Sequence, residues 1–386
     1  MKFLHISDLH LGKRINEFSM LDDQIYILNQ ILEIAQEKQV DGVIIAGDIY
    51  DKPVPPAEAV KVFDQFLTRL ADRQVKVFAV SGNHDSPERI AFGAQLMSGR
   101  GVYVSPVYDG AAAKIALTDE YGELYLHLLP FIKPAVVRHV LEKEARKEHG
   151  ANREMALPES YHDAVKTAVA RMEIDPQKRN LLVAHQFVTG AGRCDSEEVA
   201  VGGLDNVDAE VFDAFDYVAL GHIHSPQAVK RETVRYCGTP LKYSFSEADQ
   251  VKAVVVIECR EKGQVMLDTV PLVPLHDMRK IRGTYLEVTA RSYYQNSSTE
   301  DYLQITLTDE EDVPDGLAKL RVIYPNLMQL AYDNSRTKQN QAVEMTEGVQ
   351  QKSELELFAE FYELQNNQPM SREQTEFVRT LLEELR

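Results

Sequence analysis

The chain has 386 residues, of which 44% are hydrophobic and 26% charged, a composition that excludes wholesale disorder and favours two or three globular domains. Its 60 acidic residues against 42 Lys and Arg give a formal net charge of −18, which argues against charge-driven DNA binding by this chain alone; on such a substrate, metal ions or a partner would have to supply positive charge. No apolar run of about 18 residues is present that could span a membrane.

The first 275 residues predict an alternation of short strands and helices. Apolar strands are expected at residues 3–6, 43–46 and 75–80, with amphipathic helices at 20–36 and 55–70 between them. This order implies right-handed crossovers and a largely parallel sheet. The more closely spaced strands that follow are expected to form an antiparallel second sheet; they are 124–129, 181–184, 217–220, 234–237, 253–258 and 265–270. The expected fold class is therefore α/β, a two-sheet αβ sandwich with helices outside.

A proline-flanked break at residues 271–274 separates a smaller unit from this sandwich. We place the first domain at residues 1–275 and a small α+β capping domain at 276–335. The elements expected in the smaller domain are strands at 285–289, 302–307 and 327–332 and a helix at 313–323.

Five polar clusters each follow a predicted strand, and loops at the carboxyl ends of strands are where α/β sheets bind ligands. The clusters are Asp8-Leu9-His10, Gly47-Asp48, Gly82-Asn83-His84-Asp85, His185 and Gly221-His222-Ile223-His224. Each alone is an ordinary turn or strand end. Together they indicate a metal site, because Asp, Asn and His offer the mixed nitrogen and oxygen ligands that suit Mn, Fe or Zn.

The spacing of two of these clusters predicts shared coordination. Residues two apart in a strand point the same way, so Asp8 and His10 are expected to hold one ion together. His222 and His224 could do the same in an extended turn.

The five clusters resemble the signature of the calcineurin-like metallophosphoesterases, which reads D-x-H, G-D, G-N-H-D/E, H and G-H-x-H, over roughly residues 1–240. A closer resemblance is to the nuclease subunits of bacterial DNA double-strand-break repair complexes. Its motifs lie at residues 5–12, 47–51, 82–89 and 236–247, and the small domain and the terminal helices also fit. The resemblance implies a DNA nuclease, a 3′-to-5′ double-strand exonuclease with single-strand and hairpin endonuclease activity, acting as a homodimer.

Carried over to this sequence, the resemblance implies two divalent ions, expected to be Mn²⁺, with Mg²⁺, Fe and Zn left open. One ion would be held by Asp8, His10, Asp48 and His224, and the other by Asp48, Asn83, His185 and His222. Asp48 would bridge the two ions. His84 would be a catalytic residue and not a ligand, giving a proton or a hydrogen bond to the leaving oxygen. Some relatives have a second histidine where Asp51 stands, so Asp51 receives no role.

The last part of the chain predicts a polar linker at residues 336–352 and two amphipathic helices within 353–386. Both helix starts carry a capping-box pattern, Ser353 with Glu356 and Ser371 with Gln374. Their apolar stripes are Leu355, Phe358, Phe361 and Tyr362 on one helix and Phe377, Val378, Leu381, Leu382 and Leu385 on the other. These helices either pack on their own protein or dock on a partner; the resemblance implies the coiled-coil base of an ATPase subunit. The chain has no G-x-x-x-x-G-K-[ST] motif, so ATP-driven gating would come from that subunit.

Two other functions stay open at this point. The same site chemistry serves a metallophosphoesterase that acts on a small-molecule phosphodiester or a phosphoprotein. The fold could also be a scaffold that has lost catalysis, although every ligand position is filled. Lys13, Arg14 and Arg89 either steer phosphate or are ordinary surface charges. The three cysteines have no close pairing, which fits a reducing cytoplasm.

Overall fold

The structure, a computed structural model, describes residues 1–149, 157–192, 194–197, 206–335 and 370–384, together with positions 355, 358, 359 and 362. The predicted linker at 336–352 lies outside the described residues. The chain divides into two units, Met1–Asp277 and Met278–Arg386. No described helix is long and apolar enough to cross a membrane.

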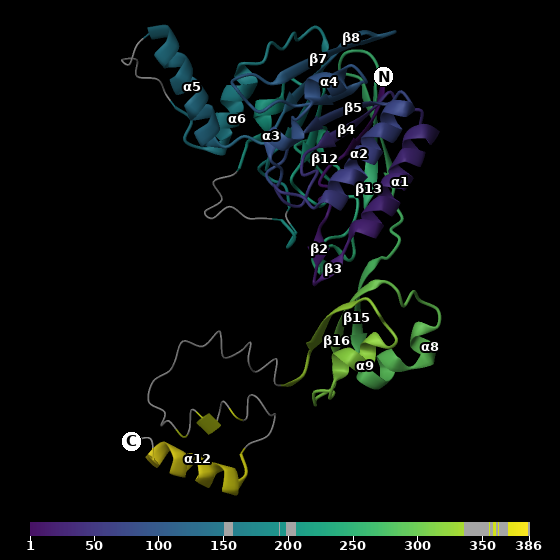
Figure 1. Ribbon diagram of the computed structural model, residues 1–386, viewed down its shortest axis with the longest axis vertical. Helices are drawn as coiled ribbons and strands as arrows, with labels where there is room; N and C mark the ends of the chain where they lie inside the picture. Colours follow the sequence, from purple (N-terminus) through teal and green to yellow (C-terminus); the bar gives the residue numbers. More distant parts are fainter. Residues whose placement is uncertain are drawn as a thin grey trace. The chain divides into compact units, whose positions relative to one another are not determined.

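Two six-stranded sheets form the first unit (Figure 1). The first sheet has the strand order β14-β13-β1-β4-β5-β6. Its strands are β1 (Lys2–Ile6), β4 (Gly42–Ala46), β5 (Lys76–Val80), β6 (Val102–Val104), β13 (Ala253–Cys259) and β14 (Val265–Pro271). As predicted, β1, β4 and β5 run parallel to one another, and β6 extends that parallel run. The antiparallel hairpin of β13 and β14 joins this sheet through β1.

The second sheet has the strand order β11-β12-β10-β9-β8-β7 and is mixed. Its strands are β7 (Ala113–Asp119), β8 (Gly122–Leu129), β9 (Arg179–His185), β10 (Tyr217–Gly221), β11 (Gln227–Val229) and β12 (Arg231–Tyr236). The prediction of an antiparallel second sheet is wrong, because β8, β9, β10 and β12 run parallel. The segments that join β8, β9 and β10 are long enough for crossovers. The short turn between β13 and β14 predicts that these two strands pair with each other. It does not predict which sheet the hairpin joins.

Helices cover the outer faces of both sheets (Figure 1). The long ones are α1 (Leu21–Glu37), α2 (Ala57–Asp72), α5 (Pro134–His149) and α6 (Tyr161–Ala170). The shorter elements of this unit are β2 (Arg14–Ile15), β3 (Phe18–Ser19), α3 (Pro87–Ile90), α4 (Ala94–Ser98), η1 (Ala209–Phe212) and η2 (Phe245–Glu247). Both α1 and α2 agree with their predictions to within two residues at each end. The prediction succeeds because each helix has one apolar stripe.

The main core lies between the two sheets. Alternate residues of each strand face the opposite sheet, so Phe3 and Phe78 of the first sheet share one cluster with Leu126, Val183 and Tyr217 of the second. All five side chains are fully buried. A second cluster packs α5 and α6 against the other face of the second sheet. This packing fixes the two sheets face to face, and with them the loops that follow their strands.

The second unit is built around three parallel strands, β15 (Met278–Gly283), β16 (Tyr302–Leu307) and β17 (Leu327–Tyr332). Its short helices are α7 (Tyr285–Thr289), α8 (Arg291–Tyr294) and α9 (Gly316–Arg321). The predictions of β16 and β17 are confirmed, and α9 is shorter than the helix predicted at 313–323. The strand predicted at 285–289 is wrong, because those residues form α7. Its N-cap Thr284 makes a capping box with Glu287, and these two hydrogen bonds overcome the strand preference of Tyr and Val.

The terminal helix α12 (Arg372–Glu384) begins as predicted. The backbone N–H of Ser371 donates to Gln374 Oε1 at 2.8 Å, and the N–H of Gln374 donates to Ser371 Oγ at 3.2 Å. The other predicted cap, Ser353 with Glu356, lies outside the described residues. On α12 the side chains of Phe377 and Leu381 are 66% and 42% exposed.

Candidate metal centre

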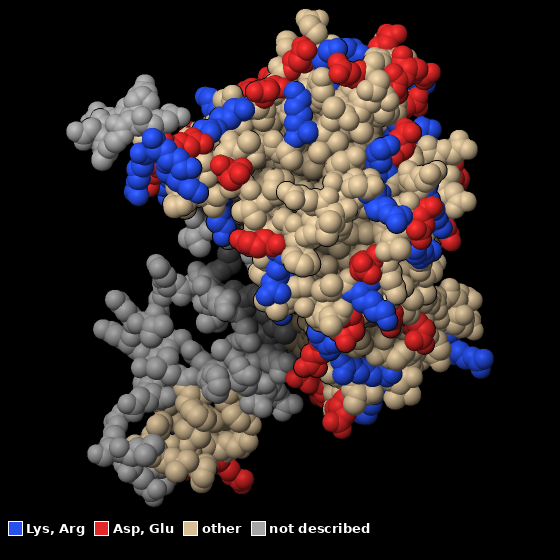
Figure 2. Space-filling model, turned by 45° about the horizontal axis from the view of Figure 1, so that its top comes forward, with Lys and Arg blue, Asp and Glu red and all other residues tan. Residues whose placement is uncertain are grey.

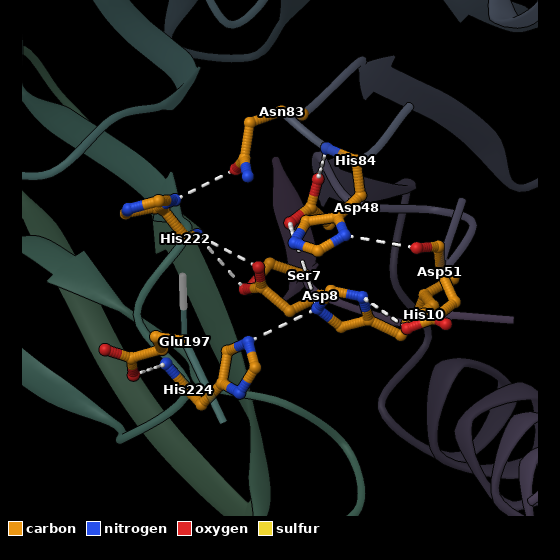
Figure 3. Close-up of polar contacts among 12 residues, drawn as sticks. Ser7, Asp8, His10, Asp48, Asp51, Asn83, His84, Glu197, His222 and His224 are labelled. Atoms are coloured by element: carbon orange, nitrogen blue, oxygen red, sulfur yellow. Dashed lines mark hydrogen bonds and ion pairs between the residues drawn. The ribbon is translucent and has the colours of Figure 1, made fainter. Parts of the chain in front are cut away.

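The loops that follow β1, β4, β5, β9 and β10 meet at one edge of the sandwich. Backbone hydrogen bonds join the first two loops: the N–H of Asp8 donates to the carbonyl of Gly47, and that of His10 to the carbonyl of Asp48, each at 3.0 Å. The backbone N–H of His222 donates to Asp8 Oδ1 at 3.0 Å and so ties in the second sheet. Side chains from both sheets therefore converge on one centre (Figure 3).

Four of the predicted ligands have left-handed backbone. The φ angles are 53° at Asp8, 45° at His10, 49° at Asp48 and 100° at His222. Such conformations cost on the order of 1–3 kcal/mol each and cluster at functional sites. They also correct the reasoning about the D-x-H spacing, because β1 ends at Ile6 and no strand carries Asp8 and His10. The two side chains converge because the loop turns, not because a strand alternates.

Asp8, His10 and His224 form the first potential ligand group, with one ligand atom from each lying within 4.8 Å of the others. The Nε2 atoms of His10 and His224 face each other at 3.2 Å. Nδ1 of His10 is buried without a hydrogen bond, and the nearest carboxylate oxygen recorded for it is Oδ1 of Asp51 at 3.6 Å. His222 does not belong to this group, so the expectation that His222 and His224 could hold one ion together is not supported.

Asp48 belongs to two further groups, one with Asp8 and His185 and one with His10 and His84. Its Oδ2 lies 3.3 Å from Nε2 of His185 and 3.8 Å from Nε2 of His10. Burial alone would raise the pKa of this carboxyl, but the surrounding imidazoles, His185 first, hold it well below its usual range. Asp48 thus presents an ionised carboxylate to both halves of the centre.

Asn83, His185 and His222 converge on the other side of Asp48. The amide oxygen of Asn83 lies 2.9 Å from Nε2 of His185 and 3.0 Å from Nδ1 of His222. The structure therefore brings all seven predicted ligands into one connected cluster.

His84 lies beside this cluster and is only half-buried. Its Nδ1 is 3.1 Å from the carbonyl oxygen of Asp51, which can only accept, so Nδ1 carries a proton. Its Nε2 lies 3.9 Å from Oδ2 of Asp48, and its ring centroid 4.8 Å from that of His10. This position is within reach of both a ligand role and a proton-transfer role.

The chemistry of the donor atoms fits divalent cations. Nδ1 of His185 donates to the carbonyl of Ala46 at 2.8 Å, which leaves the Nε2 lone pair of the neutral ring facing oxygen atoms of Asp48 and Asn83. Lone pairs repel in such an arrangement unless a cation or a proton lies among them. Burial opposes a proton there, but the Asp48 carboxylate still raises the pKa of His185 to about 9. A metal ion satisfies the same atoms without that proton.

Glycines allow the loops to approach this closely. A Cβ at Gly82 would lie 2.1 Å from Oδ1 of Asp48, and a Cβ at Gly47 would lie 2.4 Å from Nδ1 of His185. Both distances are impossible for real atoms, so only glycine fits at these positions.

Sequence reasoning missed the polar residues that support the ligands. Asp85 accepts hydrogen bonds from the backbone N–H groups of Ile49, Tyr50 and Gly82, and so joins the second and third loops. Further support for His224 comes from four polar residues, Ser196, Glu197, Glu247 and Lys252. Asp85 and Glu247 lie inside the motifs that carry the resemblance, and that position is the signal that could have identified them. Ser196, Glu197 and Lys252 lie outside those motifs, so no sequence pattern pointed to them.

The basic residues considered for phosphate steering differ in their surroundings. Nζ of Lys13 pairs with Oδ1 of Asp51 at 2.7 Å, beside the centre. Arg14 donates to the carbonyl of Glu17, and Arg89 is exposed on α3. Only Lys13 is thus held next to the predicted ligands.

Comparison with known proteins gives matches along most of the chain. Residues 1–226 match the family model described as calcineurin-like phosphoesterase, and residues 274–366 match a model described as type 5 capsule protein repressor C-terminal domain. A Staphylococcus epidermidis protein named as the D component of the nuclease SbcCD is 29% identical over 390 residues, covering 99% of this chain and 98% of its own.

Two solved structures show weaker similarity. A dimetal phosphatase from Danio rerio has a TM-score of 0.44 at 13% identity, covering 71% of this chain and 98% of its own. A Thermus thermophilus protein has a TM-score of 0.38 at 12% identity, covering 69% and 98%.

The close packing of Gly82 on Asp48 generates a prediction. Gly82→Ala should weaken binding of divalent metal by roughly tenfold or more, because the added methyl group must displace the Asp48 carboxylate. Titration of the purified variant with Mn²⁺ measures this. Gly99→Ala is the control, because the nearest atom to its Cβ would be at 3.6 Å. Metal binding by Gly82→Ala equal to that of the control would contradict the ligand role of Asp48.

Proposed function

The chain belongs to the calcineurin-like phosphoesterase family, and on this premise we propose that it is a metal-dependent DNA nuclease, the nuclease subunit that works with an SbcC-type ATPase in double-strand-break repair and recombination. The observation that carries the proposal is the convergence of seven ligand-type side chains from both sheets, with His84 beside them. The relative named as part of a nuclease, similar over nearly the whole of both chains, supports DNA as the substrate.

We assign the residues to two divalent ions, Mn²⁺ first among the candidates. Asp8, His10, Asp48 and His224 would hold one ion, and Asp48, Asn83, His185 and His222 the other. Bound ions of this kind polarise the phosphate and lower the pKa of a water that attacks phosphorus. The chain's own contribution is to aim the donor atoms. The carbonyl of Ala46 fixes the ring of His185, and Asn83 lies between His185 and His222.

His84 is proposed to act on the leaving oxygen. Because its Nδ1 is committed to the carbonyl of Asp51, only Nε2 is available on the side of the centre. In the doubly protonated ring, that atom can donate a hydrogen bond or a proton to the oxygen that leaves phosphorus. The backbone N–H of His84 donates to Oδ1 of Asp48 at 2.9 Å, so the loop that carries His84 is attached to the proposed bridging ligand.

Charge on the surface bears on how DNA would be bound. Figure 2 shows Lys and Arg interspersed with Asp and Glu at the edges of the face it draws, and few charged side chains across the middle. Together with the net charge of −18, this favours DNA binding that depends on the metal centre and on a partner. The alternative, hydrolysis of a small phosphodiester or a phosphoprotein, uses the same centre and needs no partner.

The proposed partner surface is the apolar stripe of the terminal segment. Phe377 and Leu381 lie one turn apart on α12, and both are exposed, as is Phe358. An ATPase that buries this stripe would explain why such side chains lie on the surface. Docking of an amphipathic helix into an apolar groove is a recurrent mode of recognition.

Two further proposals follow the resemblance. We propose a homodimer. The side chains of Phe92 and Leu96 are 84% and 86% exposed, and they are candidates for contact with a second copy.

We also propose a cytoplasmic location, because Cys194, Cys237 and Cys259 are free thiols.

A comparison of substrates tests the function. With Mn²⁺, the purified chain should cleave hairpin or single-stranded DNA, and duplex ends should be degraded only with the ATPase subunit and ATP. Gel assays on end-labelled DNA, beside a chromogenic small phosphodiester, measure this. Efficient turnover of the small ester with no cleavage of any DNA would support the alternative function. No turnover of either substrate, with metal bound, would support a scaffold.

Two substitutions distinguish the role of His84 as a general acid from the role of Asp48 as a metal ligand. His84→Ala should retain both metal ions and lose roughly 10² to 10⁴ in rate, the usual contribution of a general acid. Asp48→Ala should lose at least one ion, because Asp48 is the proposed bridge. Metal content by mass spectrometry and the DNA cleavage rate are the two measurements. If His84→Ala loses metal, His84 is a ligand, as its grouping with His10 and Asp48 also permits.

The partner surface can be tested on α12. Phe377→Asp with Leu381→Asp should weaken ATPase binding by roughly 10² to 10⁴-fold, because each buried side chain of this size contributes about 1.5–3 kcal/mol. Hydrolysis of a small phosphodiester should be unchanged. Thr375→Asp is the control, since Thr375 is two residues before Phe377 and therefore lies on the opposite side of the helix from it. Equal binding by the double variant and the control would mean that the stripe serves another purpose.

A further inference from the structure

Residues 236–247 carry part of the family resemblance, yet none of them is a proposed ligand. In the structure this segment is hydrogen-bonded to the main chain of His224. The backbone N–H of Thr239 donates to the carbonyl of His224 at 3.1 Å, and Nζ of Lys252 donates to the same carbonyl at 2.9 Å. From the other side, Oε1 of Glu197 accepts from the backbone N–H of His224 at 2.7 Å. The main chain of His224 is thus held by three residues.

A buried ion pair lies within this support. Nζ of Lys252 is 2.5 Å from Oε2 of Glu247, and both side chains are buried. Lys252 also donates to Oε1 of Gln250 at 2.8 Å, so its three donor positions are used. A buried charge pair of this kind is tolerated only when it is fully hydrogen-bonded. Glu247 is therefore ionised and can only accept hydrogen bonds.

Ser196 connects this carboxylate to the ring of His224. Its Oγ lies 2.5 Å from Oε1 of Glu247 and 2.6 Å from Nδ1 of His224. Since Glu247 can only accept, the serine hydroxyl donates to it, and its oxygen accepts from the ring. Nδ1 of His224 therefore carries the proton. The Nε2 atom keeps its lone pair, and it is this atom that faces Nε2 of His10 at 3.2 Å.

We propose that Ser196 and Glu247 are positioning residues that fix the tautomer and the orientation of His224 for binding a divalent cation. The inference rests on the metal centre proposed above. It gives the segment 236–247 a role: it supplies the carboxylate at the end of a His–Ser–Glu chain of hydrogen bonds. Such outer partners of histidine ligands typically contribute tenfold to a hundredfold in metal affinity.

Substitution of the serine tests the proposal, because its hydroxyl is half-buried and the Glu247–Lys252 pair stays intact. Ser196→Ala should weaken binding of one Mn²⁺ about tenfold to a hundredfold and leave the other unchanged. Ser196→Thr, which keeps the hydroxyl, should restore affinity. Ser297→Ala is the control, because Ser297 is exposed in the second unit and its hydroxyl donates to the carbonyl of Tyr294, outside the hydrogen bonds that hold His224. Calorimetric titration with Mn²⁺ and the thermal unfolding midpoint are measured for all four proteins.

A spectroscopic readout separates positioning from a structural role. In metal-free protein labelled with ¹⁵N-histidine, His224 should show the Nδ1–H tautomer, and Ser196→Ala should shift it towards a mixture of tautomers. An unchanged tautomer together with unchanged Mn²⁺ affinity in Ser196→Ala would overturn this inference alone. Wild-type protein that binds no Mn²⁺ would overturn both the inference and the metal centre on which it rests.

Discussion

The carboxylate of Asp48 is a buried negative charge, and the surrounding structure places donor atoms beside it that can hold a compensating cation. Imidazoles from both sheets approach its Oδ2, His185 from β9 and His10 from the loop after β1. Burial of a carboxylate is costly unless donors or cations offset the lost hydration. The close loops, the left-handed backbone and the glycines all serve to bring these groups within reach of one oxygen atom. The two sheets must pack face to face for this to happen, so the geometry of the metal centre depends on the packing of the core.

The positions of the predicted ligands were accessible from the sequence because each follows an apolar run that could only be a strand. Val43 to Ala46 is such a run, and Asp48 follows it. Parallel strands bring their carboxyl ends to one edge, so the three clusters of the first sheet were expected to meet. The addition of His185, His222 and His224 to them rested on the family resemblance, because the second sheet was predicted to be antiparallel. The backbone geometry was not accessible in this way. Left-handed φ values at Asp8 and His10 arise from hydrogen bonds to Gly47 and Asp48, which are distant in the chain.

The errors of the fold prediction have the same origin. A continuous apolar run predicted β13, but its pairing with β1 depends on which sheet has an open edge, a property of the assembled unit. In the second unit, one local signal outweighed another at α7, where the cap formed by Thr284 and Glu287 prevails over strand propensity. The support of His224 by Ser196 and Lys252 was likewise hidden, because single polar residues far apart in sequence carry no pattern.

The pairing of β1 with β13 has a consequence for the order in which the protein is made. Phe3 pairs with Ile257, so β1, which precedes the other strands of this unit, stays at a sheet edge until almost the whole unit has been synthesised. His222 and His224 also come late in the chain. A nascent chain therefore holds no complete centre, and a product that terminates before these histidines lacks two of the proposed ligands. The set of proposed ligands is complete only after translation has passed His224.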